Sequence, residues 1–327
     1  IAGGMIFKLA GSHGPETAAA AIVLLAITGN LVSRFVPKAD AAAPELKIHL
    51  NPIPESWRVF ALARRQLAVR NAMLGVSWFW FVGTALTAQL PNYAESHLGG
   101  DETLYLFALG VFSIGTGIGS LLCEKLSART VEIGLVPLGA FGMSFFLFDL
   151  YFARSGVASV AGLEIAGFLR QPGSWRVALD LFGVGMFAGF FLVPLFALIQ
   201  SRTPKQELSR VISGVNIQNA CFIVLAAVLG IVLQMEQFTI GSTTIRMPGL
   251  GIPQLFLCLA IANTLFAIWI FTIVPEFMMR FLSWMFVRAL YRLQLHGIEK
   301  NVPDEGPALI VCNHVSYMDA LILSASI

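Results

Sequence analysis

Two side chains near the C-terminus have the types and the spacing for acid-base chemistry. His314 and Asp319 form an HxxxxD pair in the polar stretch "NHVSYMD" at residues 313–319. An imidazole can take the proton from a hydroxyl group that attacks an acyl thioester, provided that a carboxylate orients the ring and stabilises its charged form. The pair is therefore a candidate for general base catalysis.

The backbone around this pair decides whether the two side chains can meet. Five positions on a regular helix place side chains about 140° apart, so the pair requires a turn between its members. Ser316 supplies such a turn as a helix N-cap, with Asp319 in the place of the capping-box acid. The same geometry fits a structural alternative, in which Asp319 caps the helix and His314 ends a strand.

The residues before the pair predict an interfacial helix and then the start of a soluble α/β domain. Over residues 276–293, Arg280 and Arg288 lie among aromatic and aliphatic residues, which is typical of a helix near anionic headgroups. The stretch "NVPDEGP" at 301–307 predicts a turn, and "ALIVC" at 308–312 predicts a short buried strand.

The rest of the chain has the composition of a membrane protein. Its 327 residues are 57% hydrophobic and 12% charged, and the mean hydropathy is +0.77, whereas soluble domains carry roughly a quarter charged residues. A net charge of +2 is too small to suggest a nucleic-acid partner. The four cysteines form no CxxC pair and no set of metal ligands is visible, so we expect neither a disulfide framework nor a metal ion.

Seven segments are long and apolar enough to cross a bilayer, since a spanning helix needs about 20 residues. They cover residues 18–36, 71–90, 103–122, 131–152, 178–200, 211–234 and 254–274. The order is one span, a long basic linker and then six closely spaced spans. A carrier of two six-helix halves would have this order if its first five helices were missing. A seven-span receptor fits poorly, because the long loop comes so early.

The basic residues predict the orientation of these spans. If the linker at residues 37–70 is cytoplasmic, fifteen of the 21 Lys and Arg residues share its side and five lie opposite, with Arg34 at a span end left out. This bias follows the positive-inside rule and places the C-terminal cluster in the cytoplasm. Because the chain starts at Ile1 without a signal peptide and ends within an apolar run, we expect a fragment cut at both ends.

Polar residues inside the spans are candidates for a substrate cavity, because they are costly in lipid. Ser213, Asn216 and Asn219 recur every three residues and are predicted to face inward from one helix. Hydrogen bonding between helices is the alternative. Asp180 is a further candidate, although it follows Arg176 by four residues, a spacing that favours an ion pair on one helix face.

Two spans carry glycine pairs with the spacing of close helix contacts. Gly115 and Gly119, and likewise Gly185 and Gly189, form GxxxG pairs that permit two helices to approach closely. A moving carrier and a static bundle both use such contacts, so the pairs predict packing rather than a function.

The loop after residues 103–122 resembles the signature loop of the major facilitator superfamily, in which a Gly precedes an Asp-Arg-x-Gly-x-Arg-like run. Its places are filled by Glu124, Lys125, Ser127 and Arg129. Here Glu replaces Asp, Ser replaces Gly, and Gly119 lies one residue further upstream than usual. The resemblance implies a charge relay between helix ends that favours one carrier conformation, and an ordinary positive-inside loop is the alternative.

Residues 18–275 resemble the lysophospholipid transporter branch of that superfamily. Besides the loop, the resemblance rests on "SWFWFVGTALTAQLPNYA", "DLFGVGMFAGFFLVPLFALIQSRTP" and "RVISGVNIQNACF". It implies inward movement or flipping of lysophospholipid, with membrane lipid as the other partner.

The stretch "GPALIVCNHVSYMDALIL" resembles the first block of the glycerolipid acyltransferase family, of the 2-acylglycerophosphoethanolamine type. The resemblance implies that His314 is the base and Asp319 its partner. It also implies an acyl thioester of acyl carrier protein or coenzyme A as co-substrate, with no other cofactor. The later blocks of that family fall beyond Ile327, so we expect this fragment to lack a complete site.

Together these patterns predict an all-α polytopic membrane protein, the C-terminal half of a major facilitator fold, followed by the start of an α/β acyltransferase domain. The expected divisions are the last helix of the N-terminal transporter half at 1–36, a cytoplasmic linker at 37–70, a six-helix half at 71–275, an interfacial helix at 276–293 and the acyltransferase start at 294–327. The resemblances imply a lysophospholipid transporter or flippase fused to an acyltransferase, in a bacterial-type inner membrane. The alternatives are an acyltransferase with a multi-span anchor and a major facilitator carrier for another solute.

Overall fold

The computed structural model describes residues 3, 6, 10–37, 51–63, 66–126, 132–153, 163–240, 243–292, 311, 313 and 315–326. Its elements, in chain order, are η1 (Gly11–His13), α2 (Gly14–Ser33), α3 (Pro52–Ala63), α4 (Leu67–Thr87), α5 (Leu90–Ser96), α6 (Glu102–Leu126), α7 (Leu135–Ala153), α8 (Ile165–Leu169), α9 (Ser174–Arg202), α10 (Leu208–Gln234), β1 (Gln237–Ile240), β2 (Thr243–Arg246), α11 (Ile252–Ile273), α12 (Pro275–Leu290) and α14 (Asp319–Ser326). Over these residues the fold is helical except for one β-hairpin.

Seven helical segments of the described residues are long and apolar enough to cross a membrane. They are Gly11–Ser33, Leu67–Ser96, Glu102–Leu126, Leu135–Ala153, Ser174–Arg202, Leu208–Gln234 and Ile252–Ile273. Each corresponds to one predicted span, which confirms a polytopic membrane protein. Some helices begin earlier than predicted, because residues such as Arg70 in α4 and Arg176 in α9 continue the helix beyond its apolar run.

The predicted linker at residues 37–70 contains a helix. α3 packs against α10, with Val59 and Ala63 of α3 buried. Gly214 of α10 lies in this contact, because a Cβ there would lie 3.0 Å from Cγ1 of Val59. Residues 38–50 of the linker lie outside the described residues.

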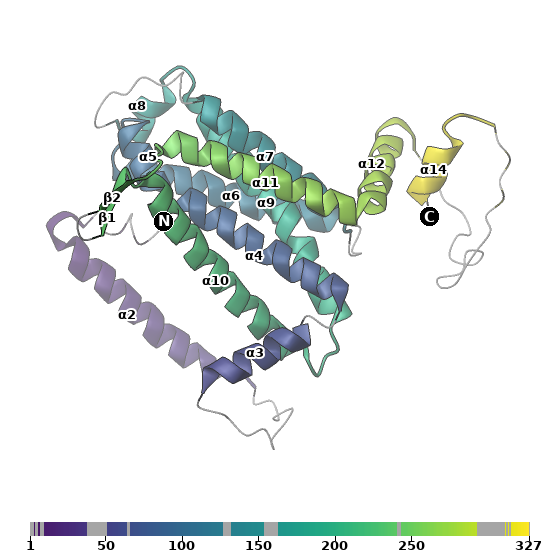
Figure 1. The fold of residues 1–327 in the computed structure, drawn as a ribbon, viewed down its shortest axis with the longest axis horizontal. Coiled ribbons are helices and arrows are strands. Elements are labelled where there is room, and N and C mark those ends of the chain that lie inside the picture. The colour runs from purple at the N-terminus through teal and green to yellow at the C-terminus, as the bar shows by residue number, and fades with distance from the viewer. Residues whose placement is uncertain are drawn as a thin grey trace.

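α9 lies at the centre of the bundle (Figure 1). It packs against α6, α7 and α4, while α7 also packs against α11 and α4 against α10. The largest fully buried side chains include Phe191 of α9, Phe256 of α11 and Met73 of α4. Several spanning helices therefore contribute to one apolar core.

The bundle has two different ends. α5, α8 and the hairpin gather at one end, while α3 and α12 lie toward the other (Figure 1). The second end carries Lys125 at the close of α6, Arg202 at the close of α9, and α12 with Arg280 and Arg288. We call it the basic end, and the first the opposite end.

The hairpin at the opposite end was not predicted. β1 and β2 pair antiparallel, with Gln237 opposite Arg246 and Ile240 opposite Thr243. Each strand has four residues, which is too short for the alternation of polar and apolar residues to stand out in a sequence.

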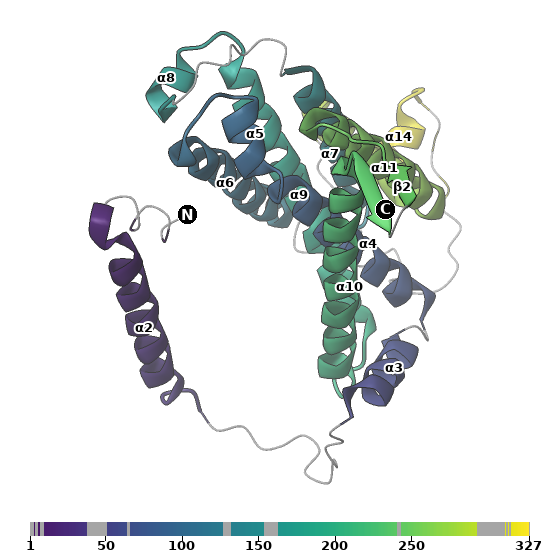
Figure 2. The same cartoon turned by 60° about the vertical axis from the view of Figure 1, so that its left-hand side comes forward.

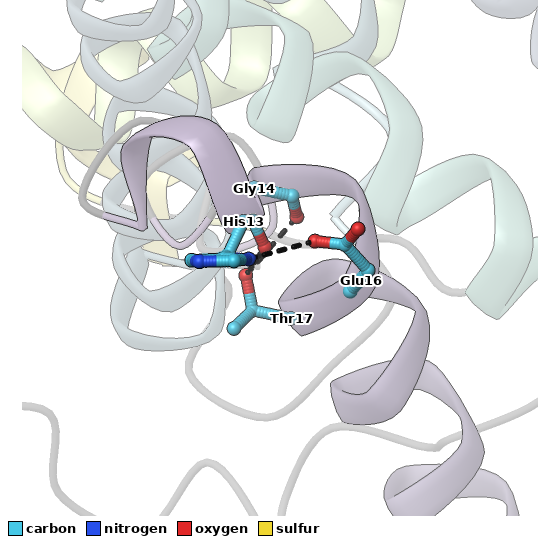
Figure 3. A network of polar contacts seen from close by, with 4 residues as sticks. All are labelled: His13, Gly14, Glu16 and Thr17. Carbon is cyan, nitrogen blue, oxygen red and sulfur yellow. Dashed lines mark hydrogen bonds and ion pairs between the residues drawn. The ribbon is translucent and has the colours of Figure 1, made fainter.

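α2 stands apart from the other spanning helices in both views (Figures 1 and 2), and none of its apolar window is buried. At its start, Nδ1 of His13 lies 3.4 Å from Oε2 of Glu16, and Oγ1 of Thr17 donates a hydrogen bond of 2.6 Å to the His13 carbonyl (Figure 3). The His13 and Glu16 side chains are exposed, so this network shapes the first turn of the helix and adds little stability.

The glycine pairs of α6 and α9 face each other, as their spacing predicts. A Cβ at Gly119 would lie 2.0 Å from the carbonyl oxygen of Met186, and a Cβ at Gly185 would lie 2.2 Å from that of Phe112. Both distances are to backbone atoms, which cannot rotate away as a side chain can. The close contact of α6 and α9 therefore requires glycine at these positions.

This contact gives a prediction with a matched control in the same helix. Gly119→Ala should lower the unfolding temperature in detergent, because overpacking against a fixed backbone costs about 1–3 kcal/mol. Gly117→Ala should leave the temperature unchanged or raise it slightly, since nothing lies within 4 Å of a Cβ there. Equal melting curves for the two variants would contradict the packing of α6 on α9.

Candidate functional site

The start of α14 forms a capping box around Asp319. Oδ2 of Asp319 accepts hydrogen bonds from the backbone N–H groups of Val315 at 2.7 Å and Ser316 at 2.8 Å. In return, Oγ of Ser316 accepts the N–H of Met318 at 3.2 Å. This reciprocal arrangement is the one that the sequence predicts for Ser316 and Asp319.

The turn that the HxxxxD pair requires is present. Val315 and Ser316 are not helical, residues 317 and 318 form a turn, and the helix begins at Asp319. His314 itself lies outside the described residues, as does the predicted strand at 308–312 apart from Val311, which is exposed. The catalytic roles of His314 and Asp319 therefore stay predictions.

α12 connects the spanning bundle to this motif. It occupies Pro275–Leu290, packs against α7 and α11 on one side, and contacts α14 on another (Figure 1). A Cβ at Gly134, just before α7, would lie 2.4 Å from the carbonyl oxygen of Phe277, so the backbones meet closely. The guanidinium of Arg288 lies 5.1 Å from the centre of the Trp284 ring, in a cation–π contact.

The predicted transport loop is described in part. Glu124 and Lys125 are exposed in the last turn of α6, at the basic end. Arg129 lies outside the described residues. The charge relay implied for these three residues stays a prediction.

The predicted polar stripe on α10 is divided between two environments. Ser213 and Asn216 are exposed, whereas Asn219 is buried. In the amide orientation that satisfies every neighbour, Asn219 donates to Oγ of Ser77 at 2.8 Å and accepts from Nε1 of Trp80 at 3.2 Å. Asn219 therefore joins α10 to α4 through hydrogen bonds between helices, which was the alternative to a cavity lining.

A second amide network was missed by sequence reasoning. Oδ1 of Asn263 accepts a hydrogen bond of 2.9 Å from Nε1 of Trp78, and its Nδ2 donates to the Ala140 carbonyl and to Oγ of Ser144, both at 2.9 Å. These bonds join α4, α7 and α11 inside the bundle. The available signal was Asn263 in the middle of a mainly apolar span, because a buried amide needs partners.

Arg176 forms its ion pair with a neighbouring helix, which corrects the expected pairing with Asp180. Its Nε donates a hydrogen bond of 2.9 Å to Oδ2 of Asp149 on α7, and its Nη2 donates to the other oxygen of the same carboxylate. A guanidinium and a carboxylate match each other in this two-bond geometry. Asp149 and Arg176 lie 27 positions apart on different helices, so the spacing of residues within one helix could not predict this pair.

Asp180 is 1% exposed and is electrostatically coupled to both Asp149 and Arg176. Its carboxyl group lies beside that of Asp149, and the two acids interact with each other and with Arg176. Asp180 therefore lies between helices, beside the ion pair.

Among the described residues, no group of three or more His, Cys, Asp or Glu side chains could hold a metal ion. Cys123 is a free buried thiol, and Cys221 and Cys258 are free and exposed.

The ion pair gives the second prediction. Arg176→Gln should lower the unfolding temperature more than Arg170→Gln, because the substitution leaves the Asp149 and Asp180 carboxylates without the guanidinium between α7 and α9. The loss should stay below the roughly 3–5 kcal/mol of a fully buried pair, since the Arg176 and Asp149 side chains are 48% and 30% exposed. Without the guanidinium, the Asp149 and Asp180 carboxylates should repel each other. Adding Asp149→Asn should therefore recover part of the loss, and no recovery would contradict this repulsion.

Comparisons with known proteins found one matching family and several related transporters. Residues 292–327 match the model of the family described as Acyltransferase. The chain is 26% identical over 185 residues to the lysophospholipid transporter LplT of Citrobacter koseri, and 26% identical over 191 residues to LplT of Salmonella paratyphi B. Both matches cover 55% of this chain, but 42% and 40% of the relatives.

The chain therefore spans less than half the length of these curated relatives. No solved structure matches it significantly. The chain therefore has lysophospholipid transporters as homologues over 55% of its length, and its residues 292–327 match an acyltransferase family.

Proposed function

We propose that the protein moves lysophospholipid to the cytoplasmic leaflet of a bacterial-type inner membrane and reacylates it there. The observation that carries the proposal is the presence of both matches on one chain, in which seven membrane-length helices precede the segment that matches an acyltransferase family. α12 supports the coupling of the two activities, because it packs against both α7 of the bundle and α14 of the acyltransferase segment.

In the proposed acyl transfer, His314 takes the proton from the free hydroxyl of the lysolipid as its oxygen attacks the thioester carbonyl. The new C–O bond forms, the C–S bond breaks, and the imidazolium returns the proton to the leaving thiolate. Asp319 orients His314, and the capping hydrogen bonds hold the Asp319 carboxylate at the helix start. The acyl donor is a thioester of acyl carrier protein or coenzyme A, and the reaction needs no metal ion.

The carrier part uses the exposed polar surface of α10. Ser213 and Asn216 are the candidates for contact with the lysolipid, because they are exposed on a spanning helix. Asn219 and Asp180 are buried between helices and support the bundle in this proposal. Glu124, Lys125 and Arg129 bias the carrier between its two conformations.

The basic end is the cytoplasmic end in this proposal. Lys125, Arg202, Arg280 and Arg288 belong to it, and positive charge favours the cytoplasmic side. The Asp319 helix lies on the same side, because α14 contacts α12.

This orientation gives the third prediction. In a full-length protein without other cysteines, Tyr317→Cys should react with a membrane-impermeant maleimide only after sealed right-side-out vesicles are opened, since Tyr317 is 98% exposed near the basic end. Thr239→Cys, exposed in the hairpin of the opposite end, should react in sealed vesicles. The reverse pattern would place acyl transfer outside the cell and would sink the proposed coupling.

The fourth prediction separates the two activities. Full-length protein with His314→Ala, in proteoliposomes, should still import labelled lysophosphatidylethanolamine but should form no diacyl product. The control His13→Ala should do both, because His13 is exposed at the start of α2. Absence of uptake by folded wild-type protein would instead indicate an acyltransferase whose helices serve as an anchor.

A further inference from the structure

An apolar pocket of about 390 Å³ opens among the helices of the basic end. Its walls include Ala68 and Gly75 of α4, Trp269 and Ile273 of α11, and Phe277 of α12. This volume lies near the lower limit of roughly 300–1,000 Å³ for small-molecule sites, which suits one extended hydrocarbon chain better than two.

Arg202 is the charged residue of this pocket. It is the last residue of α9, its side chain is exposed, and among the described residues it forms no ion pair. An exposed arginine that lines an apolar pocket matches a ligand with a hydrocarbon tail and a phosphate, because a guanidinium binds phosphate through paired hydrogen bonds. Asn71 adds a polar group to the lining.

The position of the pocket points to the acyltransferase segment. Phe277 lines it from the first turn of α12, and α12 also contacts α14, which begins with Asp319 (Figure 1). One helix therefore separates the pocket from the HxxxxD motif. A lipid held here would already be at the end of the bundle where the proposed acylation takes place.

A second apolar pocket offers an internal comparison. It has about 410 Å³ and lies toward the opposite end, among α4, α10 and α11. Its polar lining consists of the amides Gln89 and Gln234, and no charged residue lines it. Size and apolar walls are thus common to both pockets, whereas a cationic residue and contact with α12 belong to the pocket of Arg202.

We infer that the pocket of Arg202 is a staging site for lysophospholipid, which holds the single acyl chain among α4, α11 and α12 and the phosphate on Arg202. The inference rests on the proposed function and adds the place where the imported lysolipid waits before acylation. A membrane phospholipid with two chains is the competing occupant, and the test includes it.

The first experiment measures occupancy without requiring transport. Full-length protein in nanodiscs is irradiated with lysophosphatidylethanolamine that carries a diazirine on its acyl chain, and labelled peptides are mapped by mass spectrometry. We expect labels on α4 near Ala68 and on α11 near Trp269. Unlabelled lysophosphatidylethanolamine should compete, and equal competition by diacyl phosphatidylethanolamine would overturn the inference.

Matched variants test the two features of the site. Arg202→Gln should weaken this labelling about tenfold, because it removes a charge-assisted hydrogen bond to phosphate. Ala68→Trp should abolish it by filling the pocket, whereas Ala88→Trp, at an exposed position directly after α4 in the second pocket, should not. Unchanged labelling in both Arg202→Gln and Ala68→Trp would refute the site.

The second experiment measures transfer to the acyltransferase. In proteoliposomes, Arg202→Gln and Ala68→Trp should reduce the acylation of imported lysolipid while acylation of detergent-dispersed lysolipid stays near the wild-type rate. Equal rates for Ala68→Trp and Ala88→Trp with imported lysolipid would exclude a staging role. A wild-type protein that imports nothing would reject the proposed function, while the labelling experiment would still decide whether the pocket binds lysolipid.

Discussion

The backbone contact between α6 and α9 is the constraint on which the rest of the bundle depends. Glycines at Gly119 and Gly185 bring the two helices so close that a Cβ would meet a carbonyl oxygen. Such contacts suit a membrane, where helices gain no hydrophobic energy by leaving the lipid and must associate through close packing and hydrogen bonds. α9 is thereby fixed over its length, with Arg176 near its first turn and Arg202 in its last.

The hydrogen bonds of the polar side chains inside the bundle depend on the membrane in the same way, because no water is available there. A buried amide in lipid must find its partners within the protein, so Asn219 bonds to α4, and Asn263 bonds to α4 and α7. These bonds fix α10 and α11 relative to α4. Ser213 and Asn216 lie at exposed positions of α10, where the proposed function assigns them contact with the lysolipid.

Local features could be predicted from the sequence, and features that depend on distant neighbours could not. The spans follow from apolar length, and the capping box of Ser316 and Asp319 follows from residues three positions apart. The partner of Arg176 could not be predicted, because Asp149 approaches it only once α7 packs on α9. Sequence also indicated nothing of either apolar pocket, since each is lined by residues from several helices.

In the proposed function, the attachment of α12 determines how transport and acyl transfer are coupled. The close approach of Phe277 to Gly134 fixes α12 against the start of α7, and Phe281 and Val287 are buried in its contacts. A domain on a flexible tether would take lysolipid at random from the leaflet. In the proposed function, a helix that lines a pocket of the bundle and also contacts α14 would keep the acyltransferase segment beside the exit of the carrier, so that lysolipid would reach it before diffusing away.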